Sequence, residues 1–296
     1  MSTRAAGPSV RFRRASASDL PGEHAAFVAA QEELHNRRGA PWPGREYDPS
    51  GMWAQVQLHL LAHDGERSFV AEAQGQVAGF TAAMVRGDFW YFSALFVHPR
   101  YQGRGLGRHL LELAWDGPFR RRATITEAIQ PVSTGLYAQR GLLPVTPVLG
   151  FSGCPTTGDG SEQLEPAVPA PGALREVDLA AYGFDRSVDH ELWARTSARA
   201  TLWLRAGEPC AYSYCDAAGN IGPVAGSDPA SAAEALRAEL AYQAGRQARV
   251  DIPGTATAMV KVALEAGLRL GDPGLLLLSP PDRLPTSYAV HSYWLL

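Results

Sequence analysis

The sequence predicts a mixed α/β protein with two domains. Along both halves of the chain, short apolar stretches typical of strands alternate with stretches of helical periodicity. The chain has 296 residues, more than the roughly 100 to 200 of a typical single domain. A hydrophobic content of 46% supports packed cores. We therefore expect two domains, each with a central twisted mixed sheet flanked by helices.

The first half contains signals for ten elements. From the N-terminus we expect a strand, two helices and a β-hairpin that turns at Gly75, over residues 9–14, 20–34, 52–62, 68–73 and 76–84. A very apolar fourth strand, a helix, a strand, a helix and a closing strand follow, over residues 90–97, from about 104, and over 123–129, 132–140 and 143–148. A helix after each of two successive strands indicates a mixed sheet.

The chain changes character after the first half. Residues 152–172 hold four prolines among Gly, Thr, Ser and Glu, with little periodicity, which is typical of an interdomain linker. The second half then repeats the tail of the first in outline, with strands, helix, strand and helix over residues 200–215, 220–224, 230–244, 248–252 and 255–266. We therefore expect domains at 1–151 and 173–296, joined by 152–172 and related by internal duplication.

A glycine-rich loop lies between the strand that ends at Val97 and the following helix. Its residues are Gln102, Gly103, Arg104, Gly105, Leu106, Gly107 and Arg108. Glycines let the backbone approach an anion closely, and the N–H groups of the following helix point toward it. Neither a dinucleotide-binding loop nor a P-loop fits, because Arg108 stands where the first requires glycine and the Gly-Lys pair of the second is absent. A pyrophosphate fits this loop.

Two motifs in the expected order resemble the GCN5-related N-acetyltransferase (GNAT) family. Gln102 to Gly107 match its pattern of Gln or Arg, two variable residues, Gly, one variable residue, then Gly or Ala. Downstream, the segment from Leu136 to Leu142 is similar to its second signature, L-Y-x-x-x-G-F, with Leu142 in place of Phe. The resemblance covers residues 9 to 150, and its specific part is 90 to 142. It implies acetyl-CoA as co-substrate, no metal, and transfer of acetyl to an amine.

The resemblance also implies roles for individual residues. Tyr137 would protonate the departing CoA thiolate, and the backbone of Leu95, Phe96 and Val97 would pair with the pantetheine arm and polarise the thioester carbonyl. The alternatives are a core-facing aromatic residue for Tyr137 and an ordinary central strand for the three others.

The sequence leaves the general base open. Glu127 shares a strand face with two isoleucines, where its pKa would be raised, although a bend facing solvent is an equal alternative. His98 adjoins the loop and titrates in the right range, but a histidine before proline is more often structural. The acidic residues Glu32, Glu33 and Asp88 are candidates for attracting a cationic acceptor, and Trp42 and Trp53 for lining an acceptor pocket. We expect Glu127 to be the base.

The second half lacks the features that carry the chemistry. Aligned on its helices, it has Ala263 where Tyr137 stands, and its loop from Gly222 to Pro229 contains no arginine but does contain Asp228, which would repel pyrophosphate. We expect a degenerate GNAT-like domain that binds no CoA and forms a wall of the substrate cleft or a subunit contact.

The net charge and composition of the chain limit the classes of binding partner that we expect. The net charge is −3, which does not favour nucleic acid or an anionic membrane. The three cysteines match no zinc or disulfide pattern, and no apolar run of about 20 residues is present, so we expect a cytoplasmic protein. Its expected acceptor is a small-molecule or peptide amine, with a homodimer as a further candidate assembly. Two alternatives remain: a non-catalytic acetyl-CoA sensor, and an acyltransferase that uses a longer acyl-CoA or an oxygen nucleophile.

Overall fold

The computed structural model describes residues 9–156 and 163–296 and divides into two compact units. The first unit contains the chain up to Val85 together with Phe92–Pro118, and the second contains Arg86–Tyr91 and Phe119–Leu296. Part of the predicted linker, residues 157–162, lies outside the described residues. The domain boundaries at 151 and 173 stay a prediction, because the compact units follow contacts and not the repeat in the sequence.

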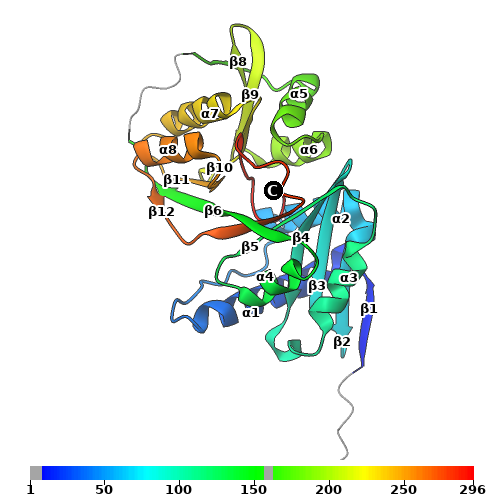
Figure 1. Cartoon of the computed structure of the whole chain (residues 1–296). Helices are drawn as coiled ribbons and strands as arrows, with labels where there is room; N and C mark the ends of the chain where they lie inside the picture. The colour runs from blue at the N-terminus through cyan, green and yellow to red at the C-terminus, as the bar shows by residue number, and fades with distance from the viewer. Residues whose placement is uncertain (1–8, 157–162) are drawn as a thin grey trace, which may run out of the picture. The chain divides into compact units, whose positions relative to one another are not determined.

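The first unit combines an antiparallel sheet with three α-helices. Its elements are β1 (Val10–Arg14), α1 (Leu20–Asn36), α2 (Met52–Asp64), β2 (Phe69–Ala73), β3 (Gln76–Arg86), β4 (Phe89–Val97) and α3 (Leu106–Trp115), with short 3-10 turns at Ala17–Asp19, Gly65–Arg67 and Pro99–Tyr101. The strand order is β1-β2-β3-β4, and the end of β3 and the first three residues of β4 belong to the second unit (Figure 1).

Local sequence explains the hairpin of this sheet. Gln74 and Gly75 form its two-residue turn with φ of 55° and 75°, the combination that matches the twist of paired strands. The hairpin predicted around Gly75 is confirmed. On one face of the sheet, Leu106 and Leu110 of α3 lie one helical turn apart and pack with Ala71, so the helix that follows the glycine-rich loop is fixed against the sheet.

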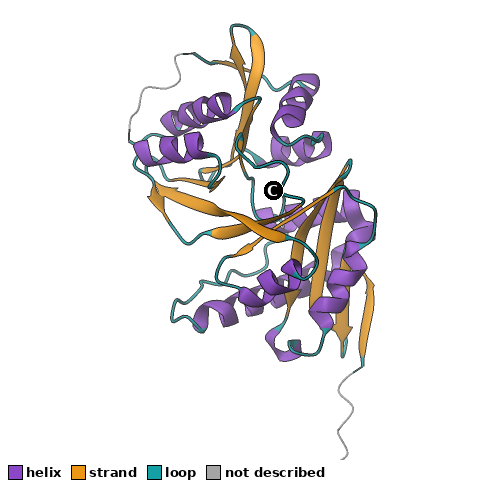
Figure 2. Cartoon of the chain, in the orientation of Figure 1, coloured by secondary structure: helices purple, strands orange, loops and turns teal. Residues whose placement is uncertain are grey.

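The second unit has helices beside a mixed sheet. Its elements are β5 (Arg121–Glu127), α4 (Pro131–Ala138), β6 (Leu143–Gly153), β7 (Glu165–Ala167), α5 (Pro171–Ala181), α6 (Ser187–Thr196), β8 (Arg199–Arg205), β9 (Glu208–Cys215), β10 (Asn220–Gly226), α7 (Pro229–Tyr242), β11 (Ala248–Pro253), α8 (Thr257–Glu265), β12 (Arg269–Leu270), β13 (Gly274–Ser279) and β14 (Tyr288–Ala289). Helices and strands alternate along most of it (Figure 2). The predicted mixed α/β fold is confirmed.

Strands distant in the sequence lie side by side in this unit. The order is β5-β13-β6-β11-β10-β9-β8-β7. The late strand β13 is antiparallel to both neighbours, with Leu276 opposite Ile125 on one side and Thr146 on the other. The second part of β6 pairs with β11. The late strand β13 therefore lies in the sheet beside β5, and β6 extends the sheet beside β11.

Helix α7 connects β10 and β11, which pair in parallel. Such a crossover needs a long connection, which an α-helix supplies. The alanine-rich inner face of α7 packs with α8 and with β10 around buried Leu236, Val250 and Met259. Among the described residues, no helix has the length and apolar composition needed to cross a bilayer.

Glu23 on α1 gives the first unit a predicted pH dependence. Its side chain is buried, with 3% of the residue exposed. Burial is the largest effect on its pKa, and together with the nearby Asp19 carboxylate it raises that pKa to about 8. The charge of Arg13 acts in the opposite direction. Because this folded pKa lies above the unfolded value of about 4.3, the protonated acid stabilises the fold at low pH. That contribution is lost as the pH rises toward about 8.

The variant Glu23→Gln cannot ionise, so we expect it to be more stable than the unmodified protein at pH 9, by an amount on the order of a few kcal/mol. At pH 4 the two should have similar stability. Urea unfolding at a series of pH values measures this, with Glu32→Gln on the exposed side of the same helix as the control. Parallel stability curves for the unmodified protein and Glu23→Gln would refute the assignment.

Candidate cofactor and acetyl-transfer site

The loop between β4 and α3 is fixed by hydrogen bonds of its own residues. The backbone N–H of Arg100 donates to Nδ1 of His98 over 3.2 Å, and the side-chain amide of Gln102 donates to the carbonyl of Val97 over 2.9 Å. His98 itself donates its backbone N–H to Ala78 of β3. Burial, followed by the charge of Arg100, lowers the pKa of His98. These contacts give His98 a structural role in shaping the loop.

Two glycines, whose backbone is open to solvent, form the turn that leads from the loop into helix α3. Gly103 and Gly105 have φ of 73° and 83°, in the left-handed region that favours glycine. A Cβ atom at either position would meet no atom within 4 Å among the described residues. Gly105 is also the N-cap of α3, and no side chain caps that helix. The N–H groups of its first turn therefore have the arrangement that binds an anion.

Cationic side chains surround this helix start. Arg100, Arg104 and Arg108 are exposed, and the guanidinium of Arg104 lies 5.7 Å from the ring centre of Tyr101. Leu106 points instead into the core of the unit, with 6% exposed, and holds the loop against the sheet. An uncapped helix start, open glycine backbone and three arginines fit the pyrophosphate of a coenzyme A.

The equivalent helix of the second half is closed to an anion. Asp228 is the N-cap of α7, and its carboxylate accepts hydrogen bonds from the backbone N–H groups of Ala230 and Ser231 at 2.8 and 2.9 Å. At Gly226, a Cβ would lie 2.3 Å from the backbone nitrogen of Ala232, so the helix packs directly against the strand end. The protein's own carboxylate occupies the N–H groups that α3 leaves open. This supports the prediction that the second half binds no CoA.

The strand segment Leu95–Val97 is half-buried, whereas Phe89 to Ala94 are buried, so β4 becomes more accessible toward the loop. The Phe96 ring is 5.0 Å from that of Phe27 and 5.5 Å from that of Phe80. The structure therefore brings the predicted cofactor strand and the glycine-rich loop together in the first unit.

An aromatic cluster extends from Phe96 into α1, α2 and the segment between them. Phe27 lies 5.5 Å from Trp42, edge to face, and 6.3 Å from Trp53, stacked. His24 lies 4.9 Å from Trp53. The sequence singled out both tryptophans but not Phe27, which joins them to Phe96, because no spacing rule links an aromatic residue on α1 to one on β4. The half-buried rings of Phe27, Trp42, Trp53 and Phe96 form a candidate acceptor surface.

Tyr137 lies on α4 in the second unit and is 4% exposed. Burial raises the pKa of its phenol above the ordinary value, against a lowering by a hydrogen bond with Ser133. The turn after the helix is closed by hydrogen bonds from Arg140 and Leu142 to the Tyr137 carbonyl. Tyr137 is therefore a protonated phenol at neutral pH, in a fixed position.

Glu127 ends β5 in the same unit, half-buried and opposite Gly274 of β13. The pKa of the neighbouring Tyr293 is raised by burial, then by the charge of Asp251, and then by the charge of Glu127. Tyr293 is not singled out by the sequence, because nothing local relates it to β5. Two of the three other acidic candidates have partners: Glu33 pairs with Arg37 at 2.6 Å, and Asp88 lies 3.8 Å from Arg121. Glu32 is exposed.

Comparison with known proteins identifies the class of this site. Residues 28–142 match the model of the acetyltransferase (GNAT) family, so this part of the chain is a GNAT domain. The match includes the glycine-rich loop and Tyr137, and it supports an acetyltransferase whose co-substrate is acetyl-CoA. A search of curated proteins finds no match to the chain.

Solved structures share the fold over the whole chain. A putative acetyltransferase from Pyrococcus horikoshii has a TM-score of 0.76 at 16% identity, covering 100% of this chain and 99% of that one. A GCN5-related N-acetyltransferase from Sphaerobacter thermophilus has a TM-score of 0.61 at 19% identity, covering 91% and 95%. A tandem GNAT protein from the clavulanic acid biosynthesis pathway has a TM-score of 0.56 at 14% identity, covering 93% and 100%. The chain therefore has a GNAT fold in tandem arrangement.

Proposed function

We propose that this protein transfers the acetyl group of acetyl-CoA to a primary amine, by direct attack of the amine on the thioester. The observation that carries the proposal is the contrast between two helix starts. Helix α3 begins at Gly105 without a side-chain cap, whereas α7 begins at Asp228, whose carboxylate occupies the first N–H groups. The open start of α3 therefore suits an anionic ligand, and that of α7 does not.

In this proposal, the backbone and side chains of Gln102 to Arg108 hold the pyrophosphate, and the backbone of Leu95, Phe96 and Val97 pairs with the pantetheine arm. An N–H of that strand would polarise the thioester carbonyl, which stabilises the oxyanion of the tetrahedral intermediate. The half-exposed state of these three residues supports the assignment, because a ligand strand needs accessible backbone.

The proton transfers follow from the bonds that change. The amine nitrogen forms a bond to the carbonyl carbon, the carbon–sulfur bond breaks, and the sulfur takes the proton of Tyr137. The nitrogen loses a proton to Glu127, directly or through water. Burial raises the pKa of the Tyr137 phenol, so it holds its proton at neutral pH and, as a weak acid, releases it only to a sulfur that already carries negative charge. An unchanged pH–rate profile in a Glu127→Gln enzyme would remove Glu127 from the role of base.

The acceptor in this proposal is a small-molecule or peptide amine that contacts the aromatic cluster around Phe27. Aromatic faces attract an alkylammonium through cation–π interactions and pack against apolar groups. The proposal therefore favours an amine attached to an apolar or aromatic body. Mass spectrometry of the protein with acetyl-CoA and a pooled amine library tests this class. An acetylated product supports the enzyme and identifies its acceptor, whereas acetyl-CoA binding without any product favours the sensor.

Substitution of Gly105 tests the cofactor loop. We expect Gly105→Ala to weaken acetyl-CoA binding by about tenfold or more, because its Cβ strains the backbone and occupies the space that the pyrophosphate approaches. Calorimetric titration of acetyl-CoA measures the affinity.

Gly207, in the turn between β8 and β9, provides a matched control. It has the same φ of 83° as Gly105, and it too has no described atom within 4 Å of a Cβ position. Gly207→Ala should therefore lose the same stability and keep its affinity for acetyl-CoA. Equal affinities in the two variants would contradict the proposed loop.

A further inference from the structure

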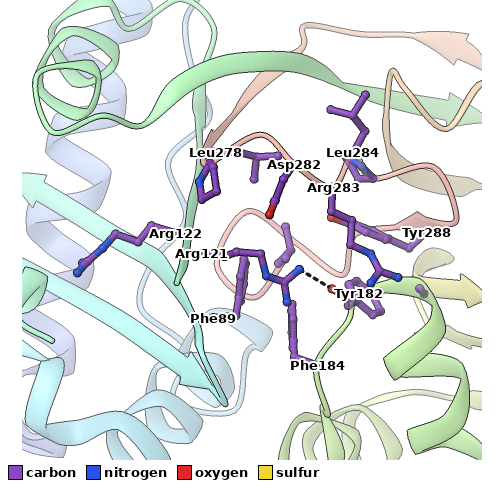
Figure 3. Close-up of a pocket in the computed structure, with 14 residues that line it drawn as sticks. Phe89, Arg121, Arg122, Tyr182, Phe184, Leu278, Asp282, Arg283, Leu284 and Tyr288 are labelled. Carbon is purple, nitrogen blue, oxygen red and sulfur yellow. Dashed lines mark hydrogen bonds between the residues drawn. The ribbon is translucent and has the colours of Figure 1, made fainter. Parts of the chain in front are cut away.

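The second unit contains a pocket that the proposed acetyl transfer does not use. It lies where the end of α5 meets the start of β5 and the loop after β13, and its lining includes Phe89, Arg121, Tyr182, Phe184, Arg283 and Tyr288 (Figure 3). All of these residues belong to one compact unit. The exposed residues Asp282–Leu284 form the solvent side of the pocket.

The walls of the pocket are aromatic and buried. The rings of Phe89 and Phe184 stack with centres 4.3 Å apart at 11°, and those of Tyr182 and Tyr288 lie 4.2 Å apart at 31°. Each of these four residues is at most 7% exposed. The walls are therefore fixed by packing, and these four residues line the pocket with apolar atoms.

Two guanidinium groups meet at the turn that ends α5. Arg121 donates from Nη1 to the carbonyl of Tyr182 over 3.1 Å and from Nη2 to that of Gly183 over 3.3 Å. Arg283 donates from Nη2 to the carbonyl of Ala180. A Cβ on Gly183 would lie 2.6 Å from Nη1 of Arg283 and 3.2 Å from Nη2 of Arg121. The two cations thus lie beside one backbone turn.

Their charges are only partly compensated. The side chain of Arg121 is 15% exposed, and the nearest carboxylate that pairs with it is Asp88, 3.8 Å away and 49% exposed. No carboxylate of the described residues lies within 4.0 Å of Arg283. Contacts with the helix-end carbonyls explain the position of both arginines, but carbonyl oxygens carry only partial charge. Two neighbouring cations beside a buried aromatic wall favour an anion.

We propose that this pocket binds the carboxylate of a small molecule whose apolar part lies against Phe89 and Phe184. A planar carboxylate accepts paired hydrogen bonds from guanidinium groups. The carboxylate of Asp282, which also lines the pocket (Figure 3), raises the cost of binding a dianion and so selects a monoanion. No residue of the glycine-rich loop belongs to the pocket.

The test uses propionate and its neutral isostere propionamide, titrated into the full chain and followed by NMR. We expect propionate to bind and propionamide not to bind. Arg283→Gln should weaken propionate binding by about tenfold, whereas Arg237→Gln, which removes an exposed arginine of α7 paired with Glu265, should leave it unchanged. Equal binding of the two probes, or an unchanged affinity in Arg283→Gln, would overturn the proposal.

A second variant gives a result that misfolding cannot imitate. Asp282→Asn removes the repelling charge and should strengthen propionate binding. Weaker or unchanged binding in a folded Asp282→Asn protein would oppose the proposed geometry, and tighter binding of inorganic phosphate than of propionate would overturn the assignment to a carboxylate. Arg283→Gln should keep its affinity for acetyl-CoA, so that this pocket and the cofactor loop can fail independently.

Discussion

Asp189→Ala is expected to destabilise the protein by about 3 to 5 kcal/mol. Asp189 is fully buried on α6 and accepts hydrogen bonds from two arginines, from Arg86 at 2.6 and 3.2 Å and from Arg186 at 3.2 Å. Burial alone would lower the pKa of Arg186, but Asp189 and the neighbouring tyrosines keep it above its ordinary value. Alanine would leave both buried cations without this shared carboxylate.

Urea unfolding measures the loss, with Glu265→Ala as the control. Glu265 also contacts two cations, Arg237 at 3.0 Å and Lys261 at 3.6 Å, but all three side chains are exposed. Because solvent screens exposed pairs, the midpoint of the control should hardly change. A midpoint for Asp189→Ala close to that of the control would show that the buried cations find other partners.

The sequence predicted the features that local chemistry determines. Gly75 identified the hairpin, because only a turn with positive φ joins two strands through two residues. The glycine-rich loop and the helix after it were found for the same reason, since open backbone and a helix start require particular residues at particular positions. Asp228 was singled out only as a charge that would repel pyrophosphate; that it caps α7 is a finding of the structure.

Long-range pairing could not be predicted. The place of the apolar strand β13 between β5 and β6 depends on strands far away in the sequence. The Arg86–Asp189 pair joins positions 103 residues apart. The pocket combines the end of α5 with a loop about 100 residues later, and no periodicity relates Arg121 to Arg283. These contacts depend on which strands meet, and hydrophobic patterning does not specify this for apolar strands.

Tyr137→Phe is expected to lower kcat by about 10² to 10⁴ and to leave the affinity for acetyl-CoA nearly unchanged. Phenylalanine keeps the ring that packs in α4 and removes only the proton donor. Without that donor, the sulfur must leave as a thiolate in a buried setting that disfavours charge. The same burial raises the pKa of the Tyr137 phenol. The substitution should therefore raise the free energy of the transition state and leave the free energy of cofactor binding unchanged.

Steady-state kinetics with the acceptor found by mass spectrometry, together with calorimetric titration of acetyl-CoA, separates the two effects. Tyr214→Phe is the matched control, because Tyr214 is also buried, at 1% exposed, and its hydroxyl bonds to His190 at 2.9 Å. That variant loses a buried hydroxyl and some stability, but it should keep the full kcat. Burial keeps the phenol of Tyr137 protonated beyond its ordinary pKa, so its ionisation should cause no fall in kcat up to about pH 10. If Tyr137→Phe turned over as fast as Tyr214→Phe, the acid would have to be sought elsewhere, and the raised pKa of Tyr137 would reflect packing alone.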